Sequence, residues 1–222
     1  MKLFHPEFSE SFLLKDDAAN VIIIENGVLF YSLTKELSLQ CEGKDGDFIL
    51  TDALCEIPAE KNIDFVGDIL NFSVNERKLA AKLLARLSDK ALDDEHFAAT
   101  AELMSAIEQY LLDLISDFDI SVHLENSIDI AMLLKAAPVT VSDIHSSLPE
   151  KICNYVKIEN EFFGKRIFAF VNLRQFLSKE DINDIYKFFR YEKLYLLLLE
   201  GYQKYTSQDA HTLIIDEDMC II

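Results

Sequence analysis

Four cations recur at every fourth position between residues 78 and 90, a spacing that could serve nucleic-acid binding. They are Lys78, Lys82, Arg86 and Lys90, and Arg77 precedes them. Residues four apart lie on one side of an α-helix, so the pattern predicts a positive stripe about 18 Å long at about 1.5 Å per residue. Such a stripe could contact successive phosphates, or it could pair with an acidic neighbouring helix. The residues alone leave both interpretations open.

The region that follows is acidic. Between residues 91 and 134 there is no Lys or Arg, whereas ten Asp and Glu residues occur. Several of these carboxylates are spaced like the oxygen ligands of a hard cation such as Ca²⁺; they are Asp117, Asp119, Glu125 and Asp129. The run is not an EF-hand, because Val122 stands where that loop requires glycine. An irregular calcium site and a solvated acidic connection both remain open.

Motifs typical of enzymes are missing from the sequence. Neither G-x-x-x-x-G-K-[ST] nor G-x-G-x-x-G occurs among the six glycines, so a phosphate-binding glycine loop has no support. The five histidines form no H-E-x-x-H pattern. Acids near strand ends could form a two-metal nuclease site; they are Glu25, Asp64, Glu200 and Asp216. Because such acids are common, we expect a protein that is not an enzyme.

Charge and cysteine usage limit the partners and the compartment. The net charge of −18 argues against nucleic acid as a partner unless the cations are segregated on one surface. The four cysteines are scattered and form no C-x-x-C pair, as expected for reduced thiols. The longest apolar run, 194–199, is too short to span a bilayer, and the first twelve residues do not resemble a signal peptide. We therefore expect a cytoplasmic protein without membrane segments.

Alternating apolar strands and helical patterns predict the fold. Residues 21–25 read as a buried strand, and 28–33, 48–51, 167–171, 194–199 and 213–215 as further strands. Helices are expected after the S-x-x-E sequence at 73–76, over 93–116 and 143–157, and after Ser178. Strand and helix alternation with strands apolar on both faces favours an α/β fold with a mainly parallel sheet. We expect an α/β head at 1–72 and 138–222, interrupted by a helical leg at 73–137.

Short sequences in a fixed order, spread over nearly the whole chain, resemble one known family. They are Val21-Ile-Ile-Ile-Glu25-Asn26, Asp68-Ile-Leu-Asn-Phe72 with Asn75, Leu133-Leu-Lys135, Phe170-Val-Asn172-Leu173-Arg174 with Phe176-Leu177, Leu197-Leu-Leu-Glu200 and Asp216-Glu217-Asp218. Each is weak alone, but their order and spacing are similar to those of the accessory protein of type II-A CRISPR adaptation modules.

The resemblance implies a fold and a function. The family has an α/β head related to P-loop folds, without the Walker motif, and a helical leg. Its members form homotetrameric rings, bind double-stranded DNA ends in the central hole, carry structural Ca²⁺ and lack nuclease activity. They assist spacer acquisition with the CRISPR integrase complex and the RNA-guided effector nuclease. Carried to this chain, the resemblance implies calcium ligands at Asp117, Asp119 and Glu125. It implies DNA contacts at Arg77, Lys78, Lys82, Arg86, Lys90 and Lys135.

Overall fold

The chain divides into two compact units in the computed structural model, which describes residues 1–74, 76–124, 128–137, 139–142, 144–204 and 210–222. The head comprises Met1–Val74 and Ile144–Ile222, and the leg comprises Asn75–Asp143. From the sequence we expect boundaries after residues 72 and 137.

A five-stranded parallel sheet forms the centre of the head. Its strands, in spatial order, are β6 (Ile63–Val66), β7 (Ile167–Val171), β8 (Tyr195–Glu200), β3 (Ala19–Ile24) and β9 (Ala210–Ile215). All neighbouring pairs in this sheet run parallel. Every residue of β3 is buried, because helices or strands cover both faces of the sheet. The predicted α/β class with a mainly parallel sheet is confirmed.

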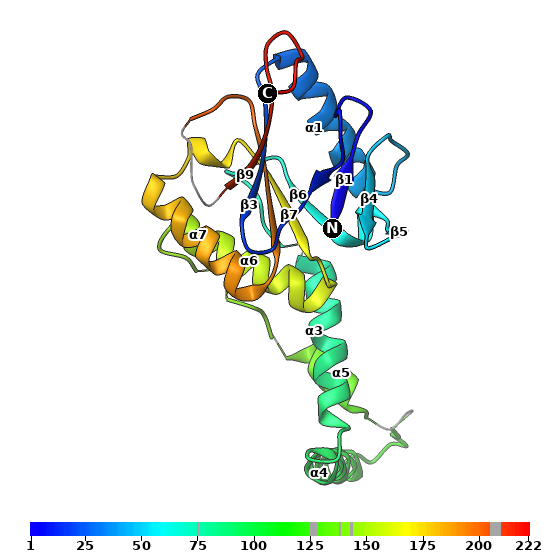
Figure 1. The fold of residues 1–222 in the computed structure, drawn as a ribbon. Coiled ribbons are helices and arrows are strands. Elements are labelled where there is room, and N and C mark those ends of the chain that lie inside the picture. The colour runs from blue at the N-terminus through cyan, green and yellow to red at the C-terminus, as the bar shows by residue number, and fades with distance from the viewer. Residues whose placement is uncertain (75, 125–127, 138, 143, 205–209) are drawn as a thin grey trace. The chain divides into compact units, whose positions relative to one another are not determined.

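Two hydrophobic cores lie on opposite faces of this sheet. Successive side chains of a strand point to opposite faces, so Val21 and Ile23 pack in one core, and Ile22 and Ile24 in the other. The first core contains α6 (Leu148–Phe163) and α7 (Lys179–Glu192), and the second contains α1 (Gly27–Cys41). Figure 1 shows α6 and α7 on the side of the sheet away from α1. The head therefore has a packed core on each face of its sheet.

A small antiparallel sheet completes the second core. Its order is β2 (Phe12–Leu13), β1 (Lys2–Phe4), β4 (Ile49–Asp52) and β5 (Cys55–Glu56), followed by the short helix α2 (Ala59–Asn62). Leu3, Phe12 and Leu50 are buried on its inner face. Only β4 corresponds to a predicted strand, because strands of two or three residues are too short to show an alternating pattern.

Helix α1 corrects one prediction. Residues 28–33 are the beginning of a helix and not a strand. The side-chain carbonyl of Asn26 accepts hydrogen bonds from the Val28 and Leu29 amides at 3.1 and 3.0 Å, which is a helix N-cap. Leu33 and Leu37, four residues apart, are the buried residues of the helix. The apolar run 28–30 misled the prediction, because a short apolar run does not separate a strand from a helix.

The other head helices begin at polar caps. The Ser178 hydroxyl and the Asp181 carboxylate form the predicted capping box of α7. Helix α6 begins at Leu148, later than the expected residue 143, because Ser147 provides its N-cap. A single 3₁₀ turn, η1 (Leu173–Gln175), follows β7.

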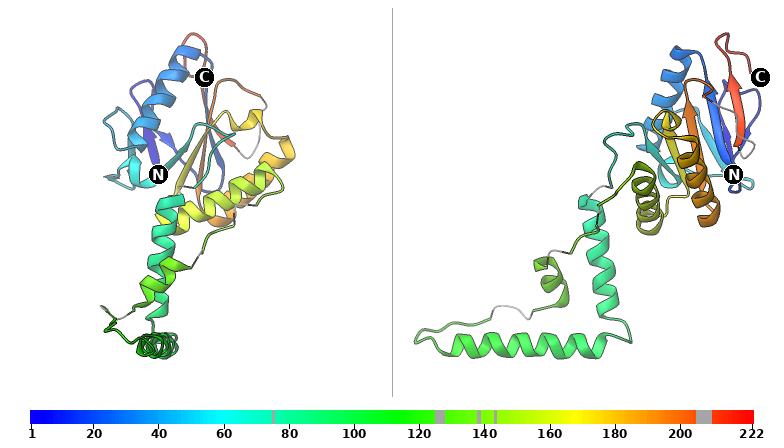
Figure 2. Two further views of the ribbon diagram at one scale, coloured as in Figure 1. Left: turned by 180° about the vertical axis from the view of Figure 1, so that it is seen from behind. Right: turned by 90° about the vertical axis from the view of Figure 1, so that its left-hand side faces the viewer.

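The leg contains α3 (Glu76–Ala91), α4 (Phe97–Ser116) and α5 (Ile130–Ala136). Figure 2 shows α5 beside α3. Helix α4 begins four residues after the predicted residue 93, because the Asp93 carboxylate accepts the amides of Glu95 and His96 and forms a turn there. Helix α3 begins at Glu76, so Ser73 is not directly before the helix; residue 75, which is, lies outside the described residues.

The leg buries little of its surface by itself. Of its described residues only Leu79 is buried, and α4 buries none of its twenty residues. Phe97 and Leu114, from the predicted apolar stripe of α4, are 58 % and 45 % exposed. Across the described residues, no helix combines the length and apolar character required to traverse a bilayer. The described leg therefore leaves every apolar residue of α4 exposed or only half-buried.

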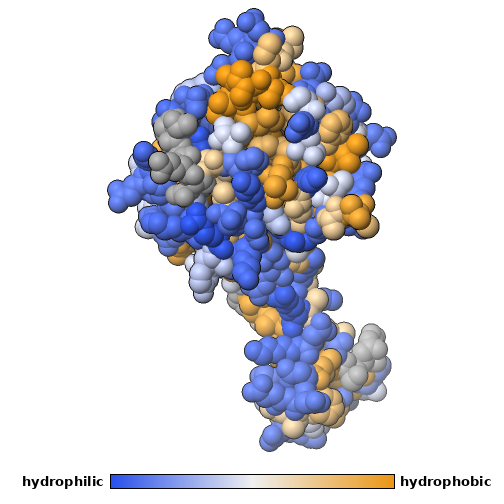
Figure 3. Space-filling view, in the orientation of Figure 1, coloured by the Kyte–Doolittle hydropathy of each residue, from blue (hydrophilic) through white to orange (hydrophobic). Residues whose placement is uncertain are grey.

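Apolar side chains also reach the surface of the head. Figure 3 shows hydrophobic groups among hydrophilic ones on one face. Leu54, in the turn between β4 and β5, is 99 % exposed, and Val28 of α1 is 82 % exposed. Single exposed apolar residues are common on folded proteins, so they do not by themselves define a site.

Candidate nucleic-acid interface

Helix α3 displays the predicted cations on its surface. Each of the five predicted side chains is exposed; they are Arg77, Lys78, Lys82, Arg86 and Lys90. Leu79 is buried and Leu83 and Leu87 are half-buried, and they follow one another from about 100° to about 180° beyond Lys78 around the helix. Lys78, Lys82 and Arg86 each also have an interaction within the chain. The apolar side of the helix therefore adjoins Arg86 and Lys90, whereas Lys78 and Lys82 lie farther from it.

The cationic face turns gradually around α3. At 3.6 residues per turn, each step of four residues advances about 40° beyond a full turn, so Lys90 lies about 120° from Lys78. Lys78, Lys82 and Arg86 fall within about 80°, whereas Arg77 lies about 100° away on the other side of Lys78. These three side chains form the centre of the stripe, and Arg77 and Lys90 lie at its margins.

Lys135 has a simpler explanation. It is exposed in the last turn of α5, where a cation interacts favourably with the carboxyl-terminal end of the helix dipole. Because α5 lies beside α3, Lys135 belongs to the same helical layer as the stripe. Its position is compatible with phosphate contact, but helix stabilisation alone also accounts for it.

The predicted calcium ligands remain a prediction. Asp117 is the C-cap residue of α4, and Asp117 and Asp119 are both exposed. Glu125 lies outside the described residues. The Asp129 carboxylate accepts the Met132 amide at 2.7 Å as the N-cap of α5. Among the described residues, Asp117 and Asp119 belong to no group of three metal-ligating side chains with ligand atoms within 4.8 Å.

One such group does occur in the head, and sequence reasoning missed it. His5, Glu36 and Asp47 come from separate segments, so no local spacing indicated it. His5 Nε2 lies 3.4 Å from the Glu36 carboxylate, and the imidazole is 5 % exposed. However, His5 Nδ1 accepts the Glu7 amide at 3.1 Å, so the neutral ring carries its proton on Nε2. A ring in this tautomer has no lone pair on Nε2 for a metal ion, and we assign the group a packing role.

Glu200 is an ionisable group buried at the carboxyl end of β8. It is 1 % exposed, and its carboxylate accepts the Arg174 amide at 3.1 Å. The Arg174 side chain, also buried, donates to the Tyr186 hydroxyl at 3.0 Å. Burial raises the pKa of Glu200 to about 7, although Arg174 and Lys204 act in the opposite direction. Glu200 thus connects β8 to η1, and it is too deeply buried to contact a phosphate.

The carboxylate of Asp64, on β6, also takes part in a hydrogen bond within the head. Its carboxylate accepts the Tyr155 hydroxyl at 2.6 Å. Burial raises the pKa of Asp64, while the Tyr155 hydrogen bond and nearby Lys165 lower it. Asp64 and Glu200 thus both accept hydrogen bonds within the head.

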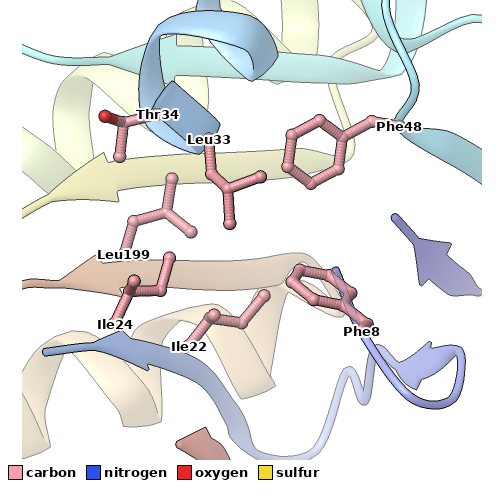
Figure 4. A pocket seen from close by; sticks show the side chains of 7 residues that line it. All are labelled: Phe8, Ile22, Ile24, Leu33, Thr34, Phe48 and Leu199. Carbon is pink, nitrogen blue, oxygen red and sulfur yellow. The ribbon is translucent and has the colours of Figure 1, made fainter. Parts of the chain in front are cut away.

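The space between α1 and the parallel sheet offers no ligand site. Figure 4 shows the side chains around it, of which only Thr34 is polar. They are Phe8, Ile22, Ile24, Leu33, Thr34, Phe48 and Leu199. The Thr34 hydroxyl donates to the Phe30 carbonyl at 2.6 Å, so it is already used. A small-molecule site needs polar groups that fix the ligand, and this space provides none.

The turn after β3 lies where P-loop folds place a phosphate-binding loop, between a parallel strand and its helix. Here only Glu25 and Asn26 separate β3 from α1. The Asn26 side chain accepts the first helix amides and donates to the Glu217 carbonyl at 3.0 Å. The chain itself therefore satisfies amides that would otherwise face a phosphate.

A comparison with known protein families assigns this chain to one of them. The family model described as CRISPR-associated protein (Cas_Csn2) matches residues 40–219, which is well over half of the chain. The chain belongs to this family. The type II-A CRISPR family recognised from the short sequence pieces is thereby confirmed, and the protein has a CRISPR-associated role.

One solved structure supports the fold. The chain is similar to Stu0660 of Streptococcus thermophilus, with a TM-score of 0.57 and 15 % identity over 97 % of this chain and 74 % of that one. A protein from Pyrococcus furiosus assigned as an ABC transporter (ATP-binding protein) matches with a TM-score of 0.41 and 12 % identity. That match covers 96 % of this chain and 97 % of the other, but it is too distant to support an argument. The Stu0660 likeness supports the α/β fold alone.

Proposed function

We propose that this protein is a non-catalytic, cytoplasmic DNA-end-binding protein that assists CRISPR spacer acquisition. In this proposal it acts as a homotetrameric ring stabilised by Ca²⁺, together with the integrase complex and the RNA-guided effector nuclease. The exposed cationic stripe of α3 in a CRISPR-associated family member is the observation that carries the proposal. Ring assembly and calcium binding are what the family resemblance implies.

Charge segregation supports DNA as the ligand. The net charge of −18 would repel a duplex from most of the surface. Lys78, Lys82 and Arg86 offer a local exception, because their spacing of about 6 Å along the helix axis brings three cations to one face. Contacts of this kind go to phosphates, so binding would be insensitive to sequence and strongly dependent on salt. Symmetric assembly would repeat the stripe around an axis.

Calcium would act on the acidic part of the leg. Asp117 and Asp119 follow α4 and are exposed, and like charges so close in sequence repel one another. A bound divalent cation would relieve that repulsion, so it would stabilise the leg or the assembly. Exposed carboxylates and carbonyls are the oxygen ligands that Ca²⁺ prefers.

A plasmid in two forms tests end binding. A closed ring has no path onto covalently closed circular DNA, so we expect retention of the linearised plasmid only, at near-physiological salt with Ca²⁺ present. Blocking both ends with bulky caps should abolish that retention. Equal binding of both forms would instead indicate an open groove. Binding of neither form would favour a scaffold whose acidic surface recruits a basic protein.

Charge reversal tests the stripe. The variant Lys82→Glu/Arg86→Glu should weaken duplex binding by at least about tenfold, because two phosphate contacts become repulsive. Lys44→Glu/Lys187→Glu, two exposed head positions, changes the net charge equally and should leave affinity nearly unchanged. Unchanged affinity in a correctly assembled stripe variant would remove α3 from the interface.

Thermal unfolding tests the calcium proposal. A ligand that binds only the native protein raises its melting temperature. We expect a higher melting temperature in Ca²⁺ than in chelator, and a smaller difference in Asp117→Asn/Asp119→Asn. Identical melting curves in Ca²⁺ and in chelator would exclude a structural calcium site.

A further inference from the structure

The outward side of α1 is apolar at its beginning. Val28 is 82 % exposed, and Tyr31, about one helical turn later, is 64 % exposed. Both lie away from the side of α1 that buries Leu33 and Leu37 in the core. Lys35 continues the outward side, with its ammonium 5.5 Å from the centre of the Tyr31 ring. Positions i, i+3 and i+7 form the line along which a second helix packs, so this side of α1 has the spacing of a helix-docking surface.

The turn after β9 adds a third exposed apolar side chain beside this end of α1. The Asn26 carboxamide joins the two segments, because its oxygen accepts the Val28 amide at 3.1 Å and its nitrogen donates to the Glu217 carbonyl at 3.0 Å. Met219, in the same turn, is 58 % exposed and has a φ of 62°, a left-handed conformation that favours glycine. Figure 3 shows hydrophobic groups gathered at this part of the head, near the carboxyl terminus. Val28, Tyr31 and Met219 are called the α1 patch below.

Acidic side chains border the α1 patch. They are Glu25, before the helix cap, and Asp216, Glu217 and Asp218, in the turn with Met219. Glu217 and Asp218 are exposed, so their charges are available to a partner. An apolar centre with a charged rim is the organisation of protein–protein interfaces. The rim here attracts a basic partner and repels an acidic one.

We propose that the α1 patch packs against a basic amphipathic helix of another protein. In this arrangement the apolar stripe of the partner helix covers Val28, Tyr31 and Met219. The Lys and Arg side chains beside that stripe pair with Glu217 and Asp218. The α1 patch belongs to the head and involves no cation of α3, so the inference goes beyond DNA binding and does not depend on it.

Charge favours a different protein over a second copy of this chain. A two-fold contact places the same surface of both copies together, so the acids of one rim would meet the same acids of the other. Each chain also carries a net charge of −18. A basic helix instead compensates the charge of the rim, and this attraction weakens as the salt concentration increases.

Two labelled peptides of equal composition provide the probe. Both consist of Leu, Lys and Arg and have about 18 residues, which make about five helical turns. One gathers the Leu residues on a single helical face, and the other distributes them around the helix. Fluorescence anisotropy measures the binding of each peptide to the whole protein at physiological ionic strength. We expect the patterned peptide to bind at least about tenfold more tightly, because only it offers a continuous apolar face.

Variants locate the contact without weakening the fold. Val28→Ala/Met219→Gly removes two apolar side chains, while alanine is the better helix former and glycine suits the left-handed φ of Met219. The melting temperature of this variant should therefore not fall, whereas its affinity for the patterned peptide should fall at least about tenfold. Tyr31→Ala should lower that affinity similarly. Leu54→Ala, at another exposed apolar position of the head, is the matched control and should leave the affinity unchanged.

The acidic rim is tested by removing charge at nearly constant size. Glu217→Gln/Asp218→Asn should lower the affinity for the patterned peptide about threefold at low salt, because exposed ion pairs contribute little each. The loss should become smaller at high salt, where the charges are screened. An equal effect at both salt concentrations would contradict the pairing of these acids with the peptide.

Two results would overturn the inference. One is equal binding of the two peptides, or an unchanged affinity for the patterned peptide in Val28→Ala/Met219→Gly. The other is a variant that dissociates an assembly of this chain but keeps its affinity for the peptide, because the α1 patch would then be a self-association surface. The same variant should bind duplex DNA like the wild type, so a failure of DNA binding would count against the proposed function alone.

Discussion

The helices of the head and of the leg use their apolar side chains differently. Helix α7 buries four residues, Ile182, Ile185, Tyr186 and Phe189, against the parallel sheet. Helix α4 is longer and richer in apolar residues, yet it buries none. An apolar stripe therefore predicts a helix in both units, but it does not tell whether the same chain supplies the covering surface.

The difference has an energetic consequence. Stability in the head comes mainly from two cores that tie distant segments together. The leg contributes mostly local terms, such as caps and helix propensity, and Leu79 is its one buried residue among those described. We expect the head to carry most of the free energy of unfolding, and the leg to open at lower cost.

Truncating one apolar side chain in each unit should give the largest difference in the free energy of unfolding between head and leg. Phe168 is fully buried, so Phe168→Ala should lower the free energy of unfolding by about 3–5 kcal/mol. Ile107 of α4 is only half-buried, so Ile107→Ala should cost about 1 kcal/mol or less. Urea denaturation at low protein concentration measures both. A comparable loss in the two variants would mean that another surface covers α4.

The buried carboxyl of Glu200 should make the stability of the head depend on pH. Its pKa is raised from 4.5 to about 7 in the folded head, so its stabilising contribution is complete below about pH 4.5 and is lost as the pH rises through about 7. The wild type should lose up to about 3 kcal/mol from this group between about pH 5 and pH 8.

Glu200→Gln removes the charge and keeps an acceptor for the Arg174 amide. Denaturant titrations at several pH values should therefore show a flatter profile in the variant than in the wild type. Parallel profiles would show that the carboxyl is not held in a desolvated site.

The smallest expected effect concerns a helix cap. Ser178→Ala removes the hydroxyl of the α7 capping box, and should cost about 1 kcal/mol. Ser178→Asn keeps an acceptor at the cap and should recover most of that loss. The melting temperature measures both variants, and equal destabilisation by Ala and Asn would argue against the cap.

Sequence reasoning succeeded where local and tertiary preferences agree. The buried runs at 21–25, 167–171 and 194–199 became β3, β7 and β8, because a strand apolar on both faces fits only inside a covered sheet. The capping box at Ser178 also formed as predicted. In each of these segments the local residue pattern was compatible with a single secondary structure.

Other features depended on contacts between distant segments. The first turns of α1 resembled a strand, although the Asn26 cap and the four-residue spacing of Leu29, Leu33 and Leu37 could have indicated a helix. The burial of Glu200 and the grouping of His5 with Glu36 arise only when remote segments meet. For the leg, residue spacing predicted a positive stripe on α3, and the side chains of that stripe are exposed, but spacing does not assign a ligand to them.

The short connection between β3 and α1 bears on how this protein could do work. In P-loop folds a nucleotide phosphate binds at the turn between such a strand and its helix. Here the Asn26 side-chain carbonyl accepts hydrogen bonds from the first amides of α1, and its side-chain NH₂ donates to the Glu217 carbonyl. A turn closed in this way leaves fewer amides free for an anion. Under the function proposed above, motion of DNA relative to the protein would draw on thermal diffusion and binding free energy.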